Sequence, residues 1–131
     1  MYYRAYKFRI YPDKVQRELI NKTFGCSRFI YNYFLSVIKE NKYTKATENI
    51  KYYTNYLKYE YPFLQEVDSI VIRKSLFNLE DSFKRCFKRQ SDYPKFKSKF
   101  NRNSYNTSAI YGSYKNNSYC NIELDLKNRT I

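Results

Sequence analysis

Apolar residues recur at intervals of three and four positions through much of residues 13–88, the spacing that lines one face of an α-helix. Asp13 and Gln16 have the spacing of a capping box at the start of this region. Asp68 is expected to cap the longest helix, because its carboxylate can accept hydrogen bonds from the amides of the first turn. Gly25 is expected to end the first helix, because glycine easily adopts the left-handed conformation found at helix ends. The four predicted helices cover residues 13–25, 26–41, 44–60 and 68–88.

Outside these helices the apolar pattern changes to a period of two, which is typical of a half-buried β-strand. Residues 3–11 alternate in this way, as do residues 105–111 and 118–126, and Gly112-Ser113 signals a turn. The order of strand, helices and strands predicts an α+β fold, with about four helices inserted between the pieces of one small antiparallel sheet. The predicted domains are residues 1–12 with the first strand, a helical domain over 13–90, and a basic loop with the remaining strands over 91–131.

The charge of the chain indicates what kind of partner it binds. The 131 residues include 25 basic and 12 acidic side chains, which gives a formal net charge of +13. Such an excess repels itself in a compact protein, so a polyanionic partner is the simplest explanation. No apolar run is long enough to span a membrane and no signal peptide is recognisable, so we expect a nucleic acid rather than a membrane. Three scattered cysteines indicate no disulfide framework and favour the reducing cytoplasm.

The segment after the longest predicted helix alternates aromatic and basic side chains, from Tyr93 to Phe100, and Asp92 is the only acid between Lys84 and Arg102. Such a segment can pair with phosphates and stack on bases. In an extended chain its three lysines would project to one side. An alternative is a solvated loop whose rings tuck under the helix. The predicted nucleic-acid-binding residues are Arg4, Lys7, Arg9, Arg28, Lys84, Arg85, Lys88, Arg89, Tyr93, Lys95, Phe96, Lys97, Lys99 and Arg102.

Catalytic chemistry has little support in the sequence. Histidine is absent, which removes the commonest general base and the usual Cys/His zinc sites. Glu123 and Asp125 share one face of a predicted strand and could touch a cation, but the solvent side of a half-buried strand is the simpler interpretation. We therefore predict no catalytic residues, no metal site and no cofactor.

Several phrases of the chain together resemble one family. The stretch YRAYKFRIYPDKVQRELINKTFGCSRFIYNYFL and the later Tyr93-Pro94-Lys95-Phe96-Lys97 are similar to the N-terminal part of TnpB, the insertion-sequence protein related to type V CRISPR nucleases. The resemblance implies a wedge domain of oligonucleotide-binding type with an inserted helical recognition domain. It also implies binding of guide RNA and target DNA. In the family, RuvC-like nuclease carboxylates and a zinc-binding insert lie C-terminal to the matched part, so the resemblance implies a truncated chain without catalysis.

Two other interpretations are open at this stage. In the first, residues 13–41 form a helix-turn-helix and a stand-alone DNA-binding protein reads a major groove with Arg28, Asn32 and Lys39. In the second, the chain is an inert remnant of a decayed mobile element. Because the strand over 118–126 comes close to the end of the chain, it is also expected to leave an unpaired sheet edge, which predicts self-association or fraying.

Overall fold

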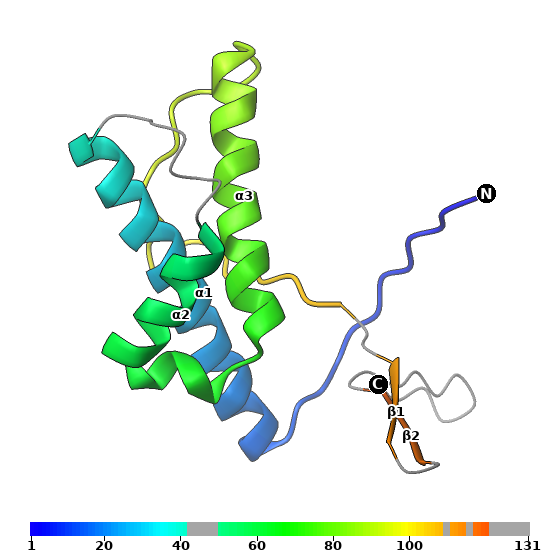
Figure 1. Cartoon of the computed structure of the whole chain (residues 1–131). Coiled ribbons are helices and arrows are strands. Elements are labelled where there is room, and N and C mark those ends of the chain that lie inside the picture. The colour runs from blue at the N-terminus through cyan, green and yellow to red at the C-terminus, as the bar shows by residue number, and fades with distance from the viewer. Residues whose placement is uncertain (42–49, 109–110, 115–116, 121–131) are drawn as a thin grey trace. The chain divides into compact units, whose positions relative to one another are not determined.

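The computed structural model describes residues 1–41, 50–108, 111–114 and 117–120. By its contacts the chain divides into two units, one of residues 18–107 and the other of residues 1–17 with 108–131. The predicted boundaries at residues 12 and 90 stay predictions; in the grouping by contacts, residues 91–107 fall in the same unit as the helices. The elements are α1 (Lys14–Asn41), α2 (Ile50–Glu60), the 3₁₀-helix η2 (Pro62–Glu66), α3 (Ser69–Phe87), β1 (Tyr111–Tyr114) and β2 (Asn117–Cys120) (Figure 1).

The first two predicted helices are one continuous helix, α1, so the predicted stop at Gly25 is wrong. The predicted capping box is confirmed: the Gln16 amide donates to Asp13 Oδ1 at 2.8 Å, and the Asp13 amide donates to Gln16 Oε1 at 3.0 Å. Gly25 itself has no positive φ. The helix continues because the buried positions keep their three- and four-residue spacing across this glycine, namely Thr23, Cys26, Ser27, Ile30, Tyr31, Phe34 and Leu35.

The core of the helical unit forms where α1 crosses α3, with α2 and η2 covering one side (Figure 1). The predicted cap of α3 is confirmed, since Asp68 Oδ1 accepts from the Ile70 amide at 2.9 Å. The Ser75 hydroxyl donates to the Ser27 carbonyl oxygen at 2.6 Å, which ties α3 to α1 inside the core. The apolar core residues from the other elements are Leu57, Leu64, Val67, Ile72, Leu76, Leu79 and Phe83.

The predicted α+β class is wrong, because no sheet of oligonucleotide-binding type forms among the described residues. Residues 3–11 make no strand, and Tyr6 and Phe8, two of the apolar residues that alternate along them, are exposed. An alternating apolar pattern forms a strand only where a second strand supplies hydrogen bonds and its side chains bury the apolar face. Two strands are described, β1 and β2, which have four residues each and pair antiparallel with Tyr111 opposite Cys120.

Two further predictions depended on the sheet: the turn at Gly112-Ser113 and self-association through an unpaired edge. Gly112 and Ser113 were predicted to turn, but they lie inside β1, opposite Tyr119 and Ser118. Self-association through an unpaired sheet edge loses its basis, because the multi-stranded sheet that it assumed is not found in the described part of the chain. Residues 44–49 of the predicted third helix and residues 121–126 of the predicted last strand lie outside the described residues.

Replacement of Gly25 by alanine tests the continuity of α1. A Cβ at Gly25 would meet no atom within 4 Å, so alanine fits without strain. We expect Gly25→Ala to raise the free energy of unfolding by about 0.5–1 kcal/mol, because alanine loses less backbone entropy in a helix. Urea unfolding followed by circular dichroism measures this change. Asn21→Ala, at an exposed position of the same helix, is the matched control. A loss of stability in Gly25→Ala alone would restore the turn at Gly25.

Candidate nucleic-acid interface

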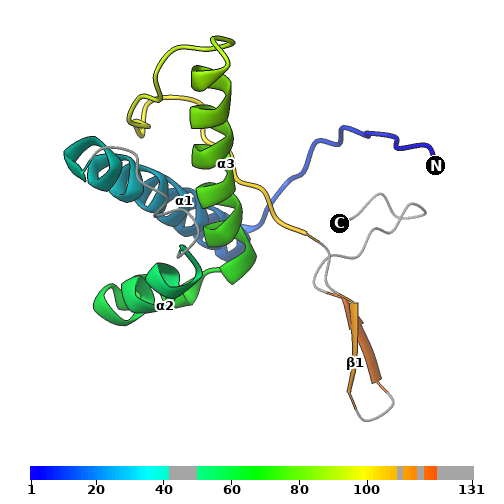
Figure 2. The same ribbon diagram turned by 45° about the horizontal axis from the view of Figure 1, so that its top comes forward.

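The basic loop after α3, residues 91–103, runs back across α1, where the side chain of Asn32 binds its backbone (Figure 2). Asn32 Oδ1 accepts from the Lys97 amide at 2.8 Å, and Asn32 Nδ2 donates to the Lys97 carbonyl oxygen at 2.9 Å. The amide of Asn32 thus pairs with the loop backbone as a neighbouring β-strand would. Further along the loop, Arg28 Nη1 donates to Asn103 Oδ1 at 3.3 Å.

Aromatic and cationic side chains complete the contact between the loop and the helices. The Lys39 ammonium lies 4.4 Å from the centroid of the Phe96 ring and 5.9 Å from that of Tyr93. Tyr93 in turn packs edge-on against Phe83 of α3, with ring centroids 5.4 Å apart. These contacts and the buried Pro94 seat the start of the loop on the helical core.

Lys97 departs from the predicted arrangement in which three alternating lysines share one side of the loop. Its ammonium lies 4.2 Å from the centroid of the Tyr31 ring of α1, within the range of a cation–π contact. Partial burial of this ammonium lowers the pKa of Lys97 below its ordinary value. Lys95 and Lys99 are exposed, and the alternation ends where the chain turns after Ser98.

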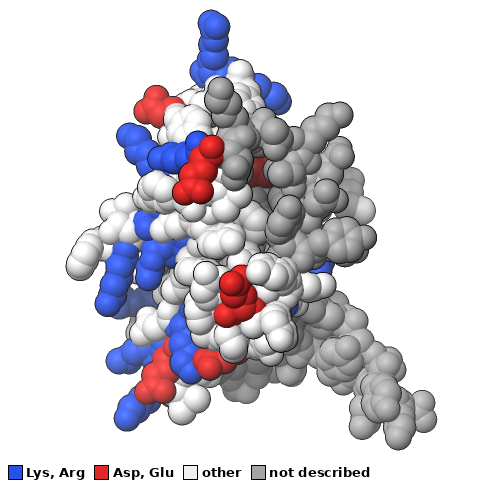
Figure 3. Space-filling model, turned by 60° about the vertical axis from the view of Figure 1, so that its left-hand side comes forward, with Lys and Arg blue, Asp and Glu red and all other residues white. Residues whose placement is uncertain are grey.

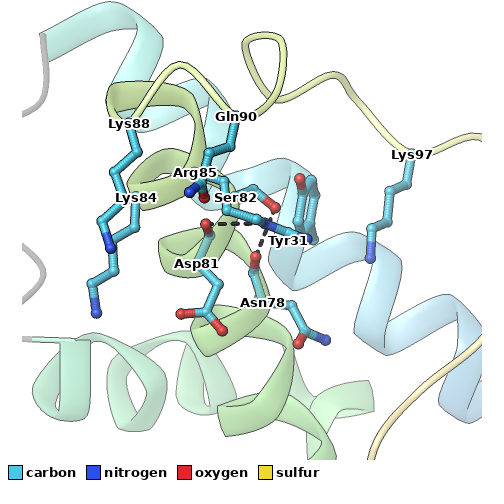
Figure 4. A pocket seen from close by; sticks show the side chains of 9 residues that line it. All are labelled: Tyr31, Asn78, Asp81, Ser82, Lys84, Arg85, Lys88, Gln90 and Lys97. Carbon is cyan, nitrogen blue, oxygen red and sulfur yellow. Dashed lines mark hydrogen bonds between the residues drawn. The ribbon is translucent and has the colours of Figure 1, made fainter.

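Basic residues from α3 and the loop meet around a pocket of about 680 Å³ (Figure 4). Asp81 is the one acidic residue of its lining, and Arg85 Nε donates to the backbone carbonyl of Asp81 at 3.4 Å. Lys84 also pairs with Glu80 one turn earlier, at 2.9 Å. The residues that line this cationic pocket are Tyr31, Asn78, Asp81, Ser82, Lys84, Arg85, Lys88, Gln90 and Lys97.

The end of α3 beside the pocket has an unusual backbone. The Gln90 amide donates to the Arg85 carbonyl and the Arg89 amide to the Cys86 carbonyl, each at 2.9 Å. These two bonds form the Schellman motif. In this motif the residue after the helix C-cap adopts the left-handed conformation and is usually glycine. Arg89 occupies that position with φ of 55°. A non-glycine residue in this conformation stores backbone strain, and strain of this kind is concentrated at functional sites.

The structure therefore brings together part of the predicted set. Lys84, Arg85, Lys88 and Lys97 line the cationic pocket, while Arg4, Lys7 and Arg9 lie in the other unit. The remaining predicted residues lie on α1, at the end of α3 or along the loop, namely Arg28, Arg89, Tyr93, Lys95, Phe96, Lys99 and Arg102. The lining residues outside the predicted set are Tyr31, Asn78, Asp81, Ser82 and Gln90. Helical spacing back from Arg85 would have found Asn78, Asp81 and Ser82, whereas Tyr31 and Gln90 depend on the path of the loop.

The face of the molecule drawn in Figure 3 carries many charged side chains. Figure 3 shows Lys and Arg side chains spread along one flank of the view, with Asp and Glu side chains between them. Among the described residues, no group of three His, Cys, Asp or Glu side chains is placed to hold a metal ion. In the same residues, no helix combines the length and the apolar character needed to cross a bilayer. Glu123 and Asp125 lie outside the described residues.

The sequence is similar to one family model and to proteins of two bacteria. Residues 1–46 match the OrfB_IS605 family model, described as a helix-turn-helix domain. A Streptomyces pristinaespiralis protein named "Putative RNA-guided DNA endonuclease" is 32% identical over 102 residues, which cover 73% of this chain and 25% of that protein. The virulence protein VsdF of Salmonella dublin is 31% identical over 112 residues, which cover 73% of this chain and 93% of that protein.

Fold and site together define a small basic helical domain with a cationic pocket. The chain belongs to the TnpB family, whose N-terminal helix-turn-helix domain of the OrfB_IS605 type it carries. It spans about a quarter of the endonuclease relative that it matches. The helical part of the matched domain that the structure describes is the single helix α1, with no turn at Gly25.

Removal of the Asn32 amide should release the loop from α1. Asn32→Ala loses both hydrogen bonds to Lys97, each contributing about 0.5–1.5 kcal/mol. We expect the backbone amide of Lys97 to exchange its hydrogen about tenfold faster or more, while amides in the middle of α3 keep their protection. Asn21→Ala makes the same substitution at an exposed position of α1, eleven residues before Asn32. It should leave the exchange rate of the Lys97 amide unchanged. Equal exchange at Lys97 in the two variants would show that Asn32 does not hold the loop.

Arg89→Gly tests whether the end of α3 is strained. We expect the free energy of unfolding to rise by about 0.5–1 kcal/mol, because glycine adopts a positive φ without a steric clash. Arg73→Gly, the same substitution at an exposed position inside α3, should lower it by about 1 kcal/mol. Urea unfolding of both variants gives the two signs. A loss of stability in both would mean that Arg89 is not strained.

Proposed function

We propose that this chain is a nucleic-acid-binding module that holds the sugar–phosphate backbone with its cationic pocket and its basic loop. The observation that carries the proposal is the convergence of Lys84, Arg85, Lys88 and Lys97 on one pocket whose lining has a single carboxylate, that of Asp81. Backbone phosphates match this site, because they offer closely spaced negative charges and oxygen acceptors to Lys and Arg donors. The net charge of +13 attracts the same partner from a distance.

The location of these cations favours recognition of shape over recognition of bases. Three of them lie in or just after the last turn of α3, where they also offset the partial negative charge of the helix C-terminus. Phosphate contacts of this kind fix a nucleic acid in place but carry no sequence information. The name of the Streptomyces relative, a putative RNA-guided DNA endonuclease, suggests guide RNA and its duplex with target DNA as the ligands of this chain.

Binding without cleavage is part of the proposal. The alignment with the endonuclease reaches only a quarter of that protein, and in the described residues no cluster of metal-binding side chains accompanies the cationic pocket. We therefore assign this chain a role in holding the nucleic acid and give none of its residues a catalytic step.

The alternative of a stand-alone helix-turn-helix protein has less support. Its reading residues Arg28, Asn32 and Lys39 contact Asn103, Lys97 and Phe96 of the basic loop. The loop would have to leave α1 before these side chains could reach base edges. The further alternative, an inert remnant of a mobile element, predicts no measurable binding.

A salt titration of binding to labelled RNA tests the proposal. Simultaneous replacement of Lys84, Arg85 and Lys88 by Gln should lower the slope of log affinity against log salt by about 2–3, since each phosphate contact contributes about 0.7–0.9. The loss should be nearly equal for unrelated sequences. Simultaneous replacement of Lys58, Arg73 and Lys74 by Gln removes the same charge elsewhere and should change the slope much less. Equal slopes for the two triple variants would refute the pocket as the binding site.

A further inference from the structure

One aromatic ring in the basic loop has no cover. Phe100 exposes 95% of its surface, more than any other large apolar side chain described between residues 18 and 107. Phe96, four residues earlier, faces the Lys39 ammonium, and Tyr93 packs on Phe83. A single exposed apolar residue is common on protein surfaces, so exposure alone gives Phe100 no role.

The backbone that carries Phe100 is held in a defined turn. The Phe100 amide donates to Ser98 Oγ at 3.3 Å, and the Asn101 amide donates to the Ser98 carbonyl oxygen at 3.2 Å. The turn follows directly after Lys97, whose backbone is fixed by Asn32. The ring is thus presented on an ordered support and is not at the end of a free segment, which lowers the entropy lost when a ligand covers it.

The surroundings of this ring indicate which ligand fits it. Lys99 precedes it, Arg102 follows it, and no acidic residue occurs between positions 93 and 108. The pocket residue Lys97 is three positions away, which limits the separation along the chain to about 10 Å. An exposed aromatic face beside cations matches a nucleotide, whose base can stack on the ring while its phosphates meet Lys or Arg. A base in a duplex is already stacked and paired, so an unpaired base fits best.

We propose that Phe100 stacks on an unpaired base of a nucleic acid whose backbone lies on the cationic pocket and the basic loop. This inference rests on the proposed function and specifies it further, because it makes single-stranded RNA or DNA the preferred ligand of this surface. Phe100 contributes affinity without reading sequence, since every base has an aromatic face. Lys99 and Arg102 bind the phosphates on either side of the stacked base.

The test compares Phe100→Ala with wild type on a labelled single-stranded RNA and on a duplex that contains the same strand. We expect single-strand affinity to fall about tenfold or more and duplex affinity to change little. The salt slope should stay at its wild-type value, because no phosphate contact is removed. Phe100→Trp should retain binding, since indole also stacks.

Tyr59→Ala is the matched control, because Tyr59 exposes 84% of its surface on α2, away from the loop in sequence. It should leave both affinities unchanged, and thermal unfolding should show that all variants are folded. Unchanged single-strand affinity in Phe100→Ala, or an equal loss for the duplex, would overturn the stacking inference alone. Wild-type protein that binds neither RNA would refute the proposed function and this inference with it.

Discussion

The two hydrogen bonds between the side-chain amide of Asn32 and the backbone of Lys97 set the position of the basic loop on α1. This loop carries Lys95, Lys97, Lys99 and Arg102 and begins just after the cationic end of α3, so electrostatic repulsion favours its departure into solvent. A planar amide offers one donor and one acceptor in the spacing of a strand partner, which gives the loop a fixed register on α1. This register places Lys97 beside Tyr31 and at the pocket, where it is the fourth cation. The turn at Ser98 comes directly after it.

The crowding of positive charge at the end of α3 is only partly relieved within the protein. Glu80 pairs with Lys84, and the partial negative charge of the helix C-terminus favours the nearby cations. Neither contact neutralises Arg85 and Lys88, and the solvent-exposed ion pair contributes little to stability. At physiological ionic strength such repulsion acts over about 8 Å. A bound polyanion would remove it, so in the proposed mode ligand binding and folding favour one another.

How far the sequence predicts this molecule depends on how local each interaction is. The caps at Asp13 and Asp68 were predictable, because each carboxylate accepts a hydrogen bond from a backbone amide at most three residues away. The stop at Gly25 was wrong because the cost of one glycine, about 1 kcal/mol, is smaller than the gain from a buried stripe that continues on both sides of it. The strand over residues 3–11 was wrong because its alternation, however regular, does not supply a partner strand. Within the candidate site, Lys84, Arg85 and Lys88 follow from helical spacing, but the addition of Lys97 depends on a contact 65 residues away in sequence.

A continuous α1 changes what the helix-turn-helix family match means for this chain. A recognition helix must present a polar face that is free to enter a major groove. One side of α1, next to its buried stripe, instead holds the basic loop through Arg28, Asn32 and Lys39. Loop and DNA base edges compete for the same three side chains, so α1 cannot serve both at once. In the proposed mode of binding, the loop stays in place and the nucleic acid lies on the pocket cations and the turn that follows Lys97. Contacts of the proposed kind would depend on the nucleic-acid backbone and on unpaired bases, and would carry no sequence information of their own.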